Sequence, residues 1–238
     1  MNAPTKIHGV QVHCDYEQGS VQWLAARCGL LTASEFDRII TPATLKVADN
    51  PKSRAHLWEL AAQRISGYVE PAYVSDSMLR GQVDEIRARE TYAEKYAPVE
   101  TCGFVTNNRW GFTLGCSPDG LVGSDGLIEC KSRGQKFQVQ TIVEHFEDGR
   151  TPDDFMLQVQ GQMLVTERKW CDLISYSGGL PMIAMRIEAD EAIQTAILDA
   201  ASKFEARINE VVSVWHDALK AGLRLTPTER EIEQEMVI

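Results

Sequence analysis

Long apolar runs are missing from this sequence. No stretch of its 238 residues approaches the roughly 18 apolar residues that a membrane-spanning helix needs. The N-terminal segment MNAPTKIHGVQVH also lacks the apolar region of a signal peptide. We therefore expect a cytoplasmic protein that has no membrane association.

Closely spaced metal-binding cysteines are missing as well. A zinc or iron–sulfur site needs ligands at short spacings, and the sequence contains no C-x-x-C pair. We therefore expect neither zinc nor an iron–sulfur cluster, and we expect most cysteines to be reduced and buried. The histidines are similarly dispersed. The cysteines are Cys14, Cys28, Cys102, Cys116, Cys130 and Cys171.

The sequence has no excess of basic charge, and its formal net charge is −10. A protein that coats nucleic acid without specificity normally has a basic surface, so the charge argues against that class. It does not exclude a nuclease, because a metal-binding carboxylate site adds acid and a basic groove can coexist with an acidic exterior. The composition, 44% hydrophobic and 24% charged, is typical of a globular protein with a sizeable core.

The first 97 residues are predicted to be mostly helical. Ser20 and Gly29 would begin and end one helix, and Thr32 followed by Glu35 has the capping-box spacing of a second. Amphipathic helices are predicted over 54–66 and 75–97, the latter with a core stripe of Leu79, Val83 and Ile86. A polar loop over 41–53 precedes the first of these helices. Basic side chains in and after this loop are candidates for contact with a DNA strand, as are Arg133 and Lys136; those at the loop are Lys46, Lys52 and Arg54.

The chain then changes to strands, predicted over 101–107, 110–117 and 126–131. Two helices, over 136–147 and 153–167, precede strands over 170–178 and 181–189. A long helix is predicted over about 190–221, and the acidic tail 226–238 is a candidate for a short last helix. This order predicts an α/β fold with a central mixed sheet flanked by helices. Its parts are a helical segment 1–97, a sheet core 101–188, and a long C-terminal helix with its tail, 190–238.

The segment TLGCSPDGLVGSDGLIECKS, residues 113–132, holds two carboxylates and a lysine around a glycine-rich turn. Side chains alternate between the faces of a strand, which places Ser117 and Asp119 on one face. The GSDG turn would return the chain antiparallel, so that Glu129 and Lys131 share a face and Asp119 meets Glu129 across the hairpin.

Two carboxylates beside a lysine suit Mg²⁺, which prefers oxygen ligands and keeps waters for a phosphate substrate. Asp119 and Glu129 would hold the metal, and the backbone carbonyl of Cys130 would be a further ligand. Lys131 would orient or deprotonate the attacking water. The alternative is an ordinary strand edge with a solvated ion pair. The spacing D-x(9)-E-x-K is too permissive to decide between them.

Other segments extend the pattern. CSPDGL…GLIECK resembles the D…E-x-K core of the PD-(D/E)xK nucleases, and specifically the phage lambda exonuclease family of viral recombinase-type alkaline exonucleases. WLAARCGLLTASEFDRII, RGQVDEIRARETY and FMLQVQGQMLVT are similar to further family motifs, in family order over residues 23–166. The resemblance implies a restriction-endonuclease-like core and a single nuclease domain over 1–238.

The resemblance also assigns roles to two residues outside the hairpin. Glu85 would be an outer acidic residue of the metal site, reached directly or through water. The helix spacing by itself also allows Glu85 a simpler role, an i,i+4 pair with Arg89. Gln158 would orient substrate or water near the metal, whereas its alternative role is to satisfy backbone groups in the core. Gln158 and Gln162 share a helix face, and Gln160 lies about 200° from Gln158.

The same resemblance implies a pocket for the 5′-phosphate of a DNA end, which Arg27, Ser34 and Ser117 would form. Unpaired N–H groups of a helix beginning at Thr32 suit an anion, and the forked, permanently charged side chain of arginine suits phosphate. Without the resemblance, Ser34 would be a helix-start residue and Arg27 a solvated one. Trp23 is expected to be core.

The resemblance implies a Mg²⁺-dependent exonuclease, with Mn²⁺ as a possible substitute, that degrades one strand of linear double-stranded DNA from its 5′ end. It would release 5′-mononucleotides and leave a 3′ overhang for recombination by single-strand annealing. The implied partners are 5′-phosphorylated DNA ends, two further copies in a homotrimer ring, and a phage single-strand annealing protein. The implied location is the bacterial host cytoplasm, with a phage or prophage gene.

Two alternatives remain open from the sequence. One is a PD-(D/E)xK nuclease of another type, either a nicking endonuclease or a CRISPR-associated iron–sulfur nuclease. The latter needs a group of cysteines near the C-terminus, but no cysteine follows Cys171. The other is a non-catalytic DNA-end-binding module, which is expected to lose metal residues, whereas Asp119, Glu129 and Lys131 are all present.

Overall fold

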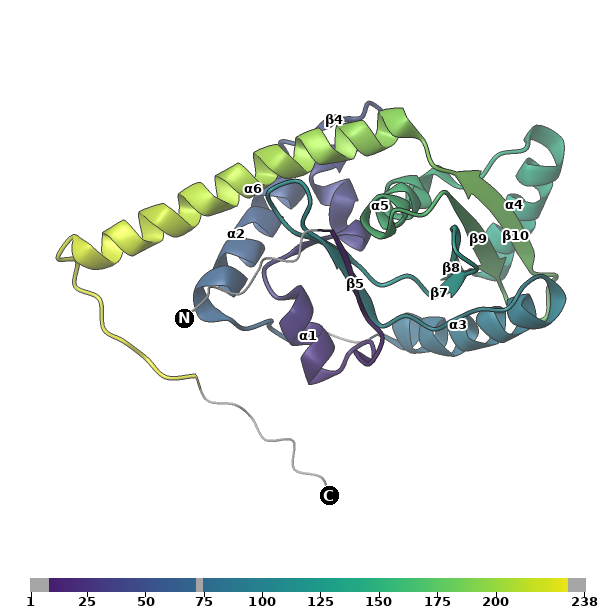
Figure 1. The fold of residues 1–238 in the computed structure, drawn as a ribbon, viewed down its shortest axis with the longest axis horizontal. Coiled ribbons are helices and arrows are strands. Elements are labelled where there is room, and N and C mark those ends of the chain that lie inside the picture. Colours follow the sequence, from purple (N-terminus) through teal and green to yellow (C-terminus); the bar gives the residue numbers. More distant parts are fainter. Residues whose placement is uncertain (1–8, 72–74, 231–238) are drawn as a thin grey trace, which may run out of the picture.

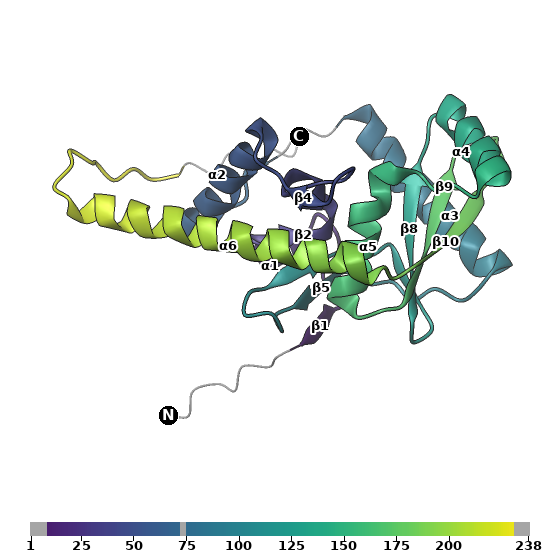
Figure 2. The same cartoon turned by 90° about the horizontal axis from the view of Figure 1, so that it is seen from above.

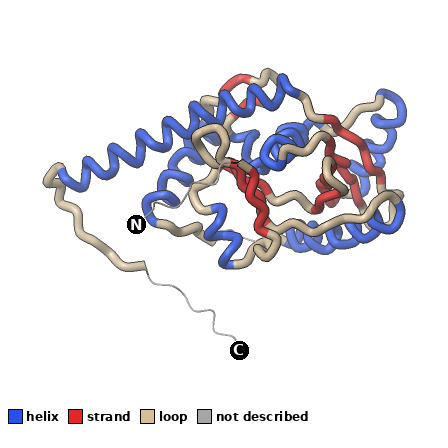
Figure 3. Tube along the Cα trace, viewed as in Figure 1, coloured by secondary structure: helices blue, strands red, loops and turns tan. Residues whose placement is uncertain are grey.

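The computed structural model describes residues 9–71 and 75–230, whose strands form two four-stranded sheets and one two-stranded sheet (Figures 1 and 3). The first sheet has the order β1 (Val10–His13), β5 (Phe104–Asn107), β6 (Leu114–Cys116), β2 (Leu31–Thr32). The second has the order β10 (Ile183–Glu188), β9 (Trp170–Tyr176), β8 (Gly126–Ser132), β7 (Gly120–Val122). The third joins β3 (Ile40–Thr41) and β4 (Lys46–Val47).

The sheet β7–β10 is mixed, as the sequence predicts. Strands β8 and β9 are parallel, whereas β7–β8 and β9–β10 are antiparallel. Helix α3 (Asp76–Lys95) buries Ala88 and Tyr92 against one face, which presents Ile128 and Ile174. Helix α5 (Met156–Thr166) buries Val159 and Met163 against the other face, which presents Leu127. The two faces therefore have separate apolar cores.

Local sequence accounts for where several helices begin. The side chains of Ser20, Asn50, Ser75 and Asp190 each accept a backbone N–H bond at a helix start, which satisfies donors that have no partner inside the helix. The helices so begun are α1 (Val21–Arg27), α2 (Pro51–Ser66), α3 and α6 (Glu191–Lys220). Helix α4 (Gln135–Asp148) ends at Gly149, which has a φ of 66° that glycine adopts without a steric penalty.

Helix α5 connects the two four-stranded sheets. It contacts β5 and β6 of the first sheet, β9 of the second, and the 3₁₀ helix η1 (Ala33–Arg38). A Cβ atom at Gly161 of α5 would collide with the ring of Phe36, so η1 packs at the closest approach that a glycine permits. Figure 1 shows α5 between β5 and the strands β7–β9. A side chain on α5 can therefore reach residues of both sheets.

The C-terminal helix α6 agrees with the predicted long helix, and only part of its apolar stripe is buried. Ile197, Phe204 and Ile208 lie in the core, whereas Trp215 and Leu219 are exposed. Figure 2 shows this end of α6 extending beyond the two sheets. Residues 223–230 form no helix, and the rest of the predicted tail helix lies outside the described residues. No helix within 9–71 and 75–230 has the length and apolar character needed to cross a membrane.

The described part of the segment 1–97 is mostly helical, as predicted, and also contributes the short strands β1–β4. Two predictions about the N-terminal and central segments are wrong. The strand ending at Cys116 does not turn back onto β8, because β6 pairs with β5 and β2 in the first sheet. The predicted core stripe of α3 is half exposed, with Leu79 at 51%, Val83 at 50% and Ile86 at 48%. The sheet instead packs on Ala88 and Tyr92, because the Tyr92 hydroxyl finds a buried acceptor in Asp172 at 2.5 Å.

Candidate active site

Asp119 and Glu129 approach each other at the open end of the β7–β8 hairpin. The antiparallel register pairs Gly120 with Ile128, so the preceding Asp119 lies beside the next residues of β8. The Asp119 carboxylate accepts a hydrogen bond at Oδ2 from the backbone N–H of Cys130 at 2.5 Å. The predicted meeting of the two acidic residues is thus present, although Ser117 and Pro118 connect the two sheets rather than continue one strand.

Glu129 is a buried carboxylate held by amide and ammonium donors. It is 3% exposed, and its Oε1 accepts from Gln158 Nε2 at 2.6 Å and faces Lys131 Nζ at 2.7 Å. Its Oε2 accepts from Gln162 Nε2 at 2.7 Å. Gln160 faces away and donates to the carbonyl of Glu188 at 2.8 Å. As predicted, one face of the Q-V-Q segment contacts the hairpin, and that face carries Gln158 and Gln162.

Lys131 completes a closed polar group with Glu129 and Gln158. Its ammonium donates to Gln158 Oε1 at 2.8 Å and lies 4.9 Å from the centroid of the Phe155 ring. Burial acts to lower the pKa of Lys131, but the adjacent Glu129 carboxylate outweighs this effect and raises the pKa above its ordinary value. The lysine is therefore fixed as a charged donor at the edge of the acidic group.

Glu85 approaches the acidic group from α3, on the other face of the sheet. Its carboxylate pairs with Arg89 at 3.1 Å, and Arg89 also donates to the backbone carbonyl of Asp119 at 3.2 Å. Desolvation raises the pKa of Glu85; Arg89 acts in the opposite direction, and Glu129 adds to the rise. The i,i+4 pair is formed, and the same arginine ties Glu85 to Asp119. A metal-binding role for Glu85 stays a prediction.

The charges of this group favour a cation. Burial raises the pKa of Asp119 well above its ordinary value, and the carboxylates of Glu129 and Glu85 raise it further. An ionised carboxylate has about four acceptor positions. Among the described residues, three donors contact Glu129 and one contacts Asp119. Acceptor positions therefore remain on both side chains for a metal ion.

The third predicted ligand, the carbonyl of Cys130, has the orientation the prediction needs. The N–H and C=O groups of one strand residue point to the same side of the strand, and the Cys130 N–H points to Asp119. Its carbonyl is therefore directed to the side on which Asp119 lies. Two carboxylates and a carbonyl form an all-oxygen set, which fits Mg²⁺ or Mn²⁺ better than zinc.

The three residues predicted to bind a 5′-phosphate lie at one edge of the first sheet. Strands β2 and β6 are parallel, with Thr32 opposite Gly115, so Ser34 and Ser117 follow strand ends at the same edge. The Ser117 hydroxyl accepts from the Trp23 indole at 2.8 Å, and the Arg27 guanidinium lies 4.5 Å from the centroid of the Trp23 ring. The buried Trp23 thus links Arg27 to Ser117 as a core residue, as predicted.

The capping box predicted at Thr32 is not formed. The Thr32 side chain makes no hydrogen bond to the backbone of η1. Its hydroxyl instead donates to Glu35 Oε2 at 2.8 Å, and the helix is of the tighter 3₁₀ type. The S/T-x-x-E spacing does bring these two side chains together, but the bond joins side chain to side chain.

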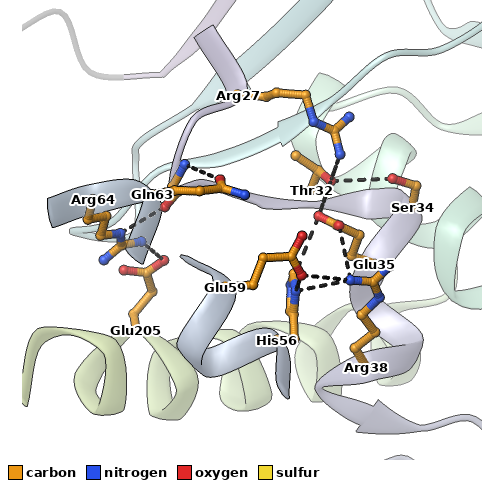
Figure 4. A network of polar contacts seen from close by, with 11 residues as sticks. Arg27, Thr32, Ser34, Glu35, Arg38, His56, Glu59, Gln63, Arg64 and Glu205 are labelled. Carbon is orange, nitrogen blue, oxygen red and sulfur yellow. Dashed lines mark hydrogen bonds and ion pairs between the residues drawn. The ribbon is translucent and has the colours of Figure 1, made fainter. Parts of the chain in front are cut away.

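A second group of metal-binding residue types contains Glu35, His56 and Glu59, whose ligand atoms lie within 4.8 Å of one another. Figure 4 shows Arg38 among them. Arg38 Nη1 lies 3.1 Å from Glu59, 3.2 Å from His56 Nδ1 and 3.5 Å from Glu35. A guanidinium therefore already supplies the positive charge there, and we assign no metal to this group.

Two residues that the sequence analysis names, Gln162 and Arg89, received no role in the site from the sequence. Gln162 holds Glu129, and Arg89 joins Glu85 to Asp119. Helical spacing places Gln162 beside Gln158, so the signal for Gln162 was present. The link from Arg89 to Asp119 joins positions 30 apart, and no local pattern contains it.

A D…E-x-K group on a mixed sheet flanked by helices defines a nuclease of the PD-(D/E)xK class, and comparisons with known proteins agree. The alkaline exonuclease LHK-Exo from Laribacter hongkongensis is 31% identical; the similarity covers 84% of this chain and 99% of that one, with a TM-score of 0.73. Its crystal structure in complex with dAMP gives a TM-score of 0.74 at the same identity. A phage-related exonuclease from Haemophilus somnus 129PT is 12% identical over 78% of this chain and 96% of that one, with a TM-score of 0.61, and shows the fold.

Residues 22–169 match the family described as the YqaJ-like viral recombinase domain. The chain belongs to this family, and its resemblance to the phage lambda exonuclease family is confirmed. The family and the relatives make the chain a nuclease of the recombination type. No match was found among curated proteins.

Proposed function

We propose that the protein is a Mg²⁺-dependent 5′-to-3′ exonuclease that degrades one strand of linear double-stranded DNA. The observation that carries the proposal is the buried carboxylate Glu129, held by Gln158, Gln162 and Lys131 and facing Asp119 across the β7–β8 hairpin. Lys131 offsets the charge of only one of the two carboxylates, so a further cation would lower the cost of burying both. A divalent metal bound to them would activate water and stabilise negative charge on the phosphate.

The residues of the chain would perform the other tasks. Asp119, Glu129 and the Cys130 carbonyl would bind the metal, with Glu85 outside them. Gln158 would orient the water or the scissile phosphate. Lys131, already an ammonium donor at this edge, would offset charge that develops on the phosphate.

Recognition of the DNA end would fall to Arg27, Ser34 and Ser117. They lie at the edge of the first sheet where β6 ends. The chain leaves this edge through Ser117 and Pro118 and reaches Asp119, so the 5′-phosphate pocket would adjoin the cleavage site. Binding of the terminal phosphate there would place a neighbouring phosphodiester at the metal. A relative in complex with dAMP, a deoxynucleoside monophosphate, supports mononucleotide release as the reaction outcome.

The proposed assembly is a homotrimer ring around DNA, with a single-strand annealing protein as partner for the 3′ overhang. A ring would let a chain with a net charge of −10 retain DNA by topology. Light scattering tests this assembly directly: the expected mass is three times the 26.6 kDa of the chain. A monomeric mass at micromolar concentration would contradict it.

The activity is tested with Mg²⁺ and three DNA substrates: a linear duplex with 5′-phosphate ends, the same duplex with 5′-hydroxyl ends, and a closed circle. We expect fast release of mononucleotides from the phosphorylated duplex, slower release from the hydroxyl duplex, and none from the circle. Cutting of the circle would establish an endonuclease instead. Binding of ends without nucleotide release would establish a non-catalytic end-binding module.

A further inference from the structure

The Thr32 hydroxyl lies at the centre of the residues proposed to bind the 5′-phosphate. Arg27 Nη2 lies 3.2 Å from Thr32 Oγ1, Ser34 Oγ lies 3.3 Å from it, and Glu35 Oε2 lies 2.8 Å from it. Figure 4 shows Arg27, Ser34 and Glu35 approaching Thr32 from three directions. Two of these three neighbours are proposed phosphate ligands.

The direction of each hydrogen bond follows from the number of hydrogens. Thr32 has one hydroxyl hydrogen, and it donates this hydrogen to the Glu35 carboxylate. Its oxygen can then only accept from Arg27 and from Ser34. Arg27 and Ser34 thus donate to a single oxygen atom, as they would to one oxygen of a phosphate group.

Glu35 is itself held in place from its other side. Its Oε1 lies 3.5 Å from Arg38 Nη1, and its Oε2 lies 3.6 Å from Arg27 Nη2. Arg38 is fixed in turn by Glu59 and the buried His56. The carboxylate that receives the Thr32 hydrogen therefore has little freedom to move, which fixes the direction of the hydroxyl.

The Thr32 hydroxyl has no backbone role that explains this arrangement. Thr32 is 1% exposed, its backbone is paired with β6, and its side chain does not cap η1. A valine has nearly the same shape and would fill the same space in a strand. The hydroxyl therefore contributes its bonds to Arg27, Ser34 and Glu35.

We infer that Thr32 is a positioning residue for recognition of the 5′-phosphate, with Glu35 setting the direction of its hydroxyl. The inference rests on the proposed function. Before DNA binds, the Thr32 oxygen holds Arg27 and Ser34 pointing to one place. An incoming phosphate oxygen then receives donors that are already oriented, which lowers the entropy cost of binding.

The test compares Thr32→Val with Thr32→Ser, which keeps the hydroxyl. Affinities for duplexes with 5′-phosphate and 5′-hydroxyl ends are measured in EDTA, where no metal-dependent cleavage is expected. In Thr32→Val, we expect the preference for the phosphorylated end to fall about tenfold, equivalent to about 1.4 kcal/mol. With Mg²⁺, KM for phosphorylated ends should rise more than kcat falls. Thr32→Ser should restore the preference for phosphorylated ends and the KM for those ends to within about threefold of wild type.

Thr141→Val removes the hydroxyl of another buried threonine, on α4, and should leave the preference unchanged. Wild type without any preference for phosphorylated ends would overturn the proposed pocket itself. A wild-type preference that Thr32→Val retains in full would overturn the role of Thr32 alone. A loss of preference that Thr32→Ser does not restore, in variants whose melting temperature matches wild type, would overturn the role of the hydroxyl.

Discussion

Gln162 donates a hydrogen bond to Glu129 Oε2 at 2.7 Å from inside the core, where it is 1% exposed. Its amide oxygen finds no hydrogen-bond partner among the described residues. A buried polar atom without a partner costs free energy, so the amide is retained at a cost to stability. Orientation of Glu129 is the gain that offsets this cost.

Gln162→Leu is accordingly expected to lower nuclease activity by about 10- to 100-fold, the range found when a residue supporting a metal ligand is lost. Its stability should change little, because the unpaired oxygen disappears with the bond. Activity under single-turnover conditions and urea unfolding check both statements. Gln160→Leu on the opposite face is the matched control. It breaks bonds to Glu188 and Asp190, so it should lose stability and keep its activity per folded molecule.

Lys131→Ala is expected to abolish cleavage while the fold and DNA binding remain. The ammonium contacts Glu129 and Gln158, and loss of a positioned catalytic donor typically costs about 10²- to 10⁴-fold in rate. Nucleotide release from 5′-phosphorylated duplex, measured beside an end-binding assay, gives the answer. Near-normal release would show that the lysine has no part in the chemistry.

Mg²⁺ is expected to stabilise the folded protein through Asp119 and Glu129. A ligand that binds only the folded state stabilises it in proportion to the logarithm of its concentration, by about 1.4 kcal/mol at ten times Kd. The melting temperature should therefore rise with Mg²⁺, and EDTA should reverse the rise. Asp119→Asn should remove the response. A response that survives in Asp119→Asn would place the metal elsewhere.

The sequence predicts those parts of the fold whose determinants are local. The GSDG turn before β8 and the alternation that brings Asp119 to Glu129 follow from the local sequence, although β7 itself was not predicted. Helical periodicity places Gln158 and Gln162 on one face, and the family resemblance selects Gln158. The division into two sheets could not be predicted in this way. Alternation from Cys116 to Asp119 is consistent with one continuous strand, and only the pairing of β6 with β5 and β2 shows the break.

Burial on α3 escaped prediction for a similar reason. The apolar periodicity of Leu79, Val83 and Ile86 is a local property, but the sheet buries Tyr92 because Asp172, 80 positions away, accepts its hydroxyl hydrogen. The partners of Thr32 were also predicted only in part. Its spacing to Glu35 predicts their contact, yet the donors from Arg27 and Ser34 depend on how α1, β2 and η1 are arranged in space.

The ion pair between Arg64 and Glu205 connects α6 to the turn that follows Arg27. Arg64 Nη2 lies 2.7 Å from Glu205, and Arg64 Nε donates to the carbonyl of Gly29 at 2.7 Å. The Glu205 side chain is 9% exposed and the Arg64 side chain 22%, so removal of one partner leaves a mostly buried charge. We expect Glu205→Gln to lower the free energy of unfolding by about 1–3 kcal/mol, the cost of leaving a buried hydrogen-bonding group without its partner.

The matched control is Asp199→Asn, which breaks the pair between Asp199 and Lys203 on the same helix. Those side chains are 57% and 59% exposed, and exposed pairs contribute little because solvent screens them. Urea unfolding should therefore show a change of under about 0.5 kcal/mol for Asp199→Asn. Equal effects of the two substitutions would mean that Arg64 gains nothing from its buried partner. The link between α6 and the Arg27 turn would then depend on packing and on the bond from Arg64 to Asn209.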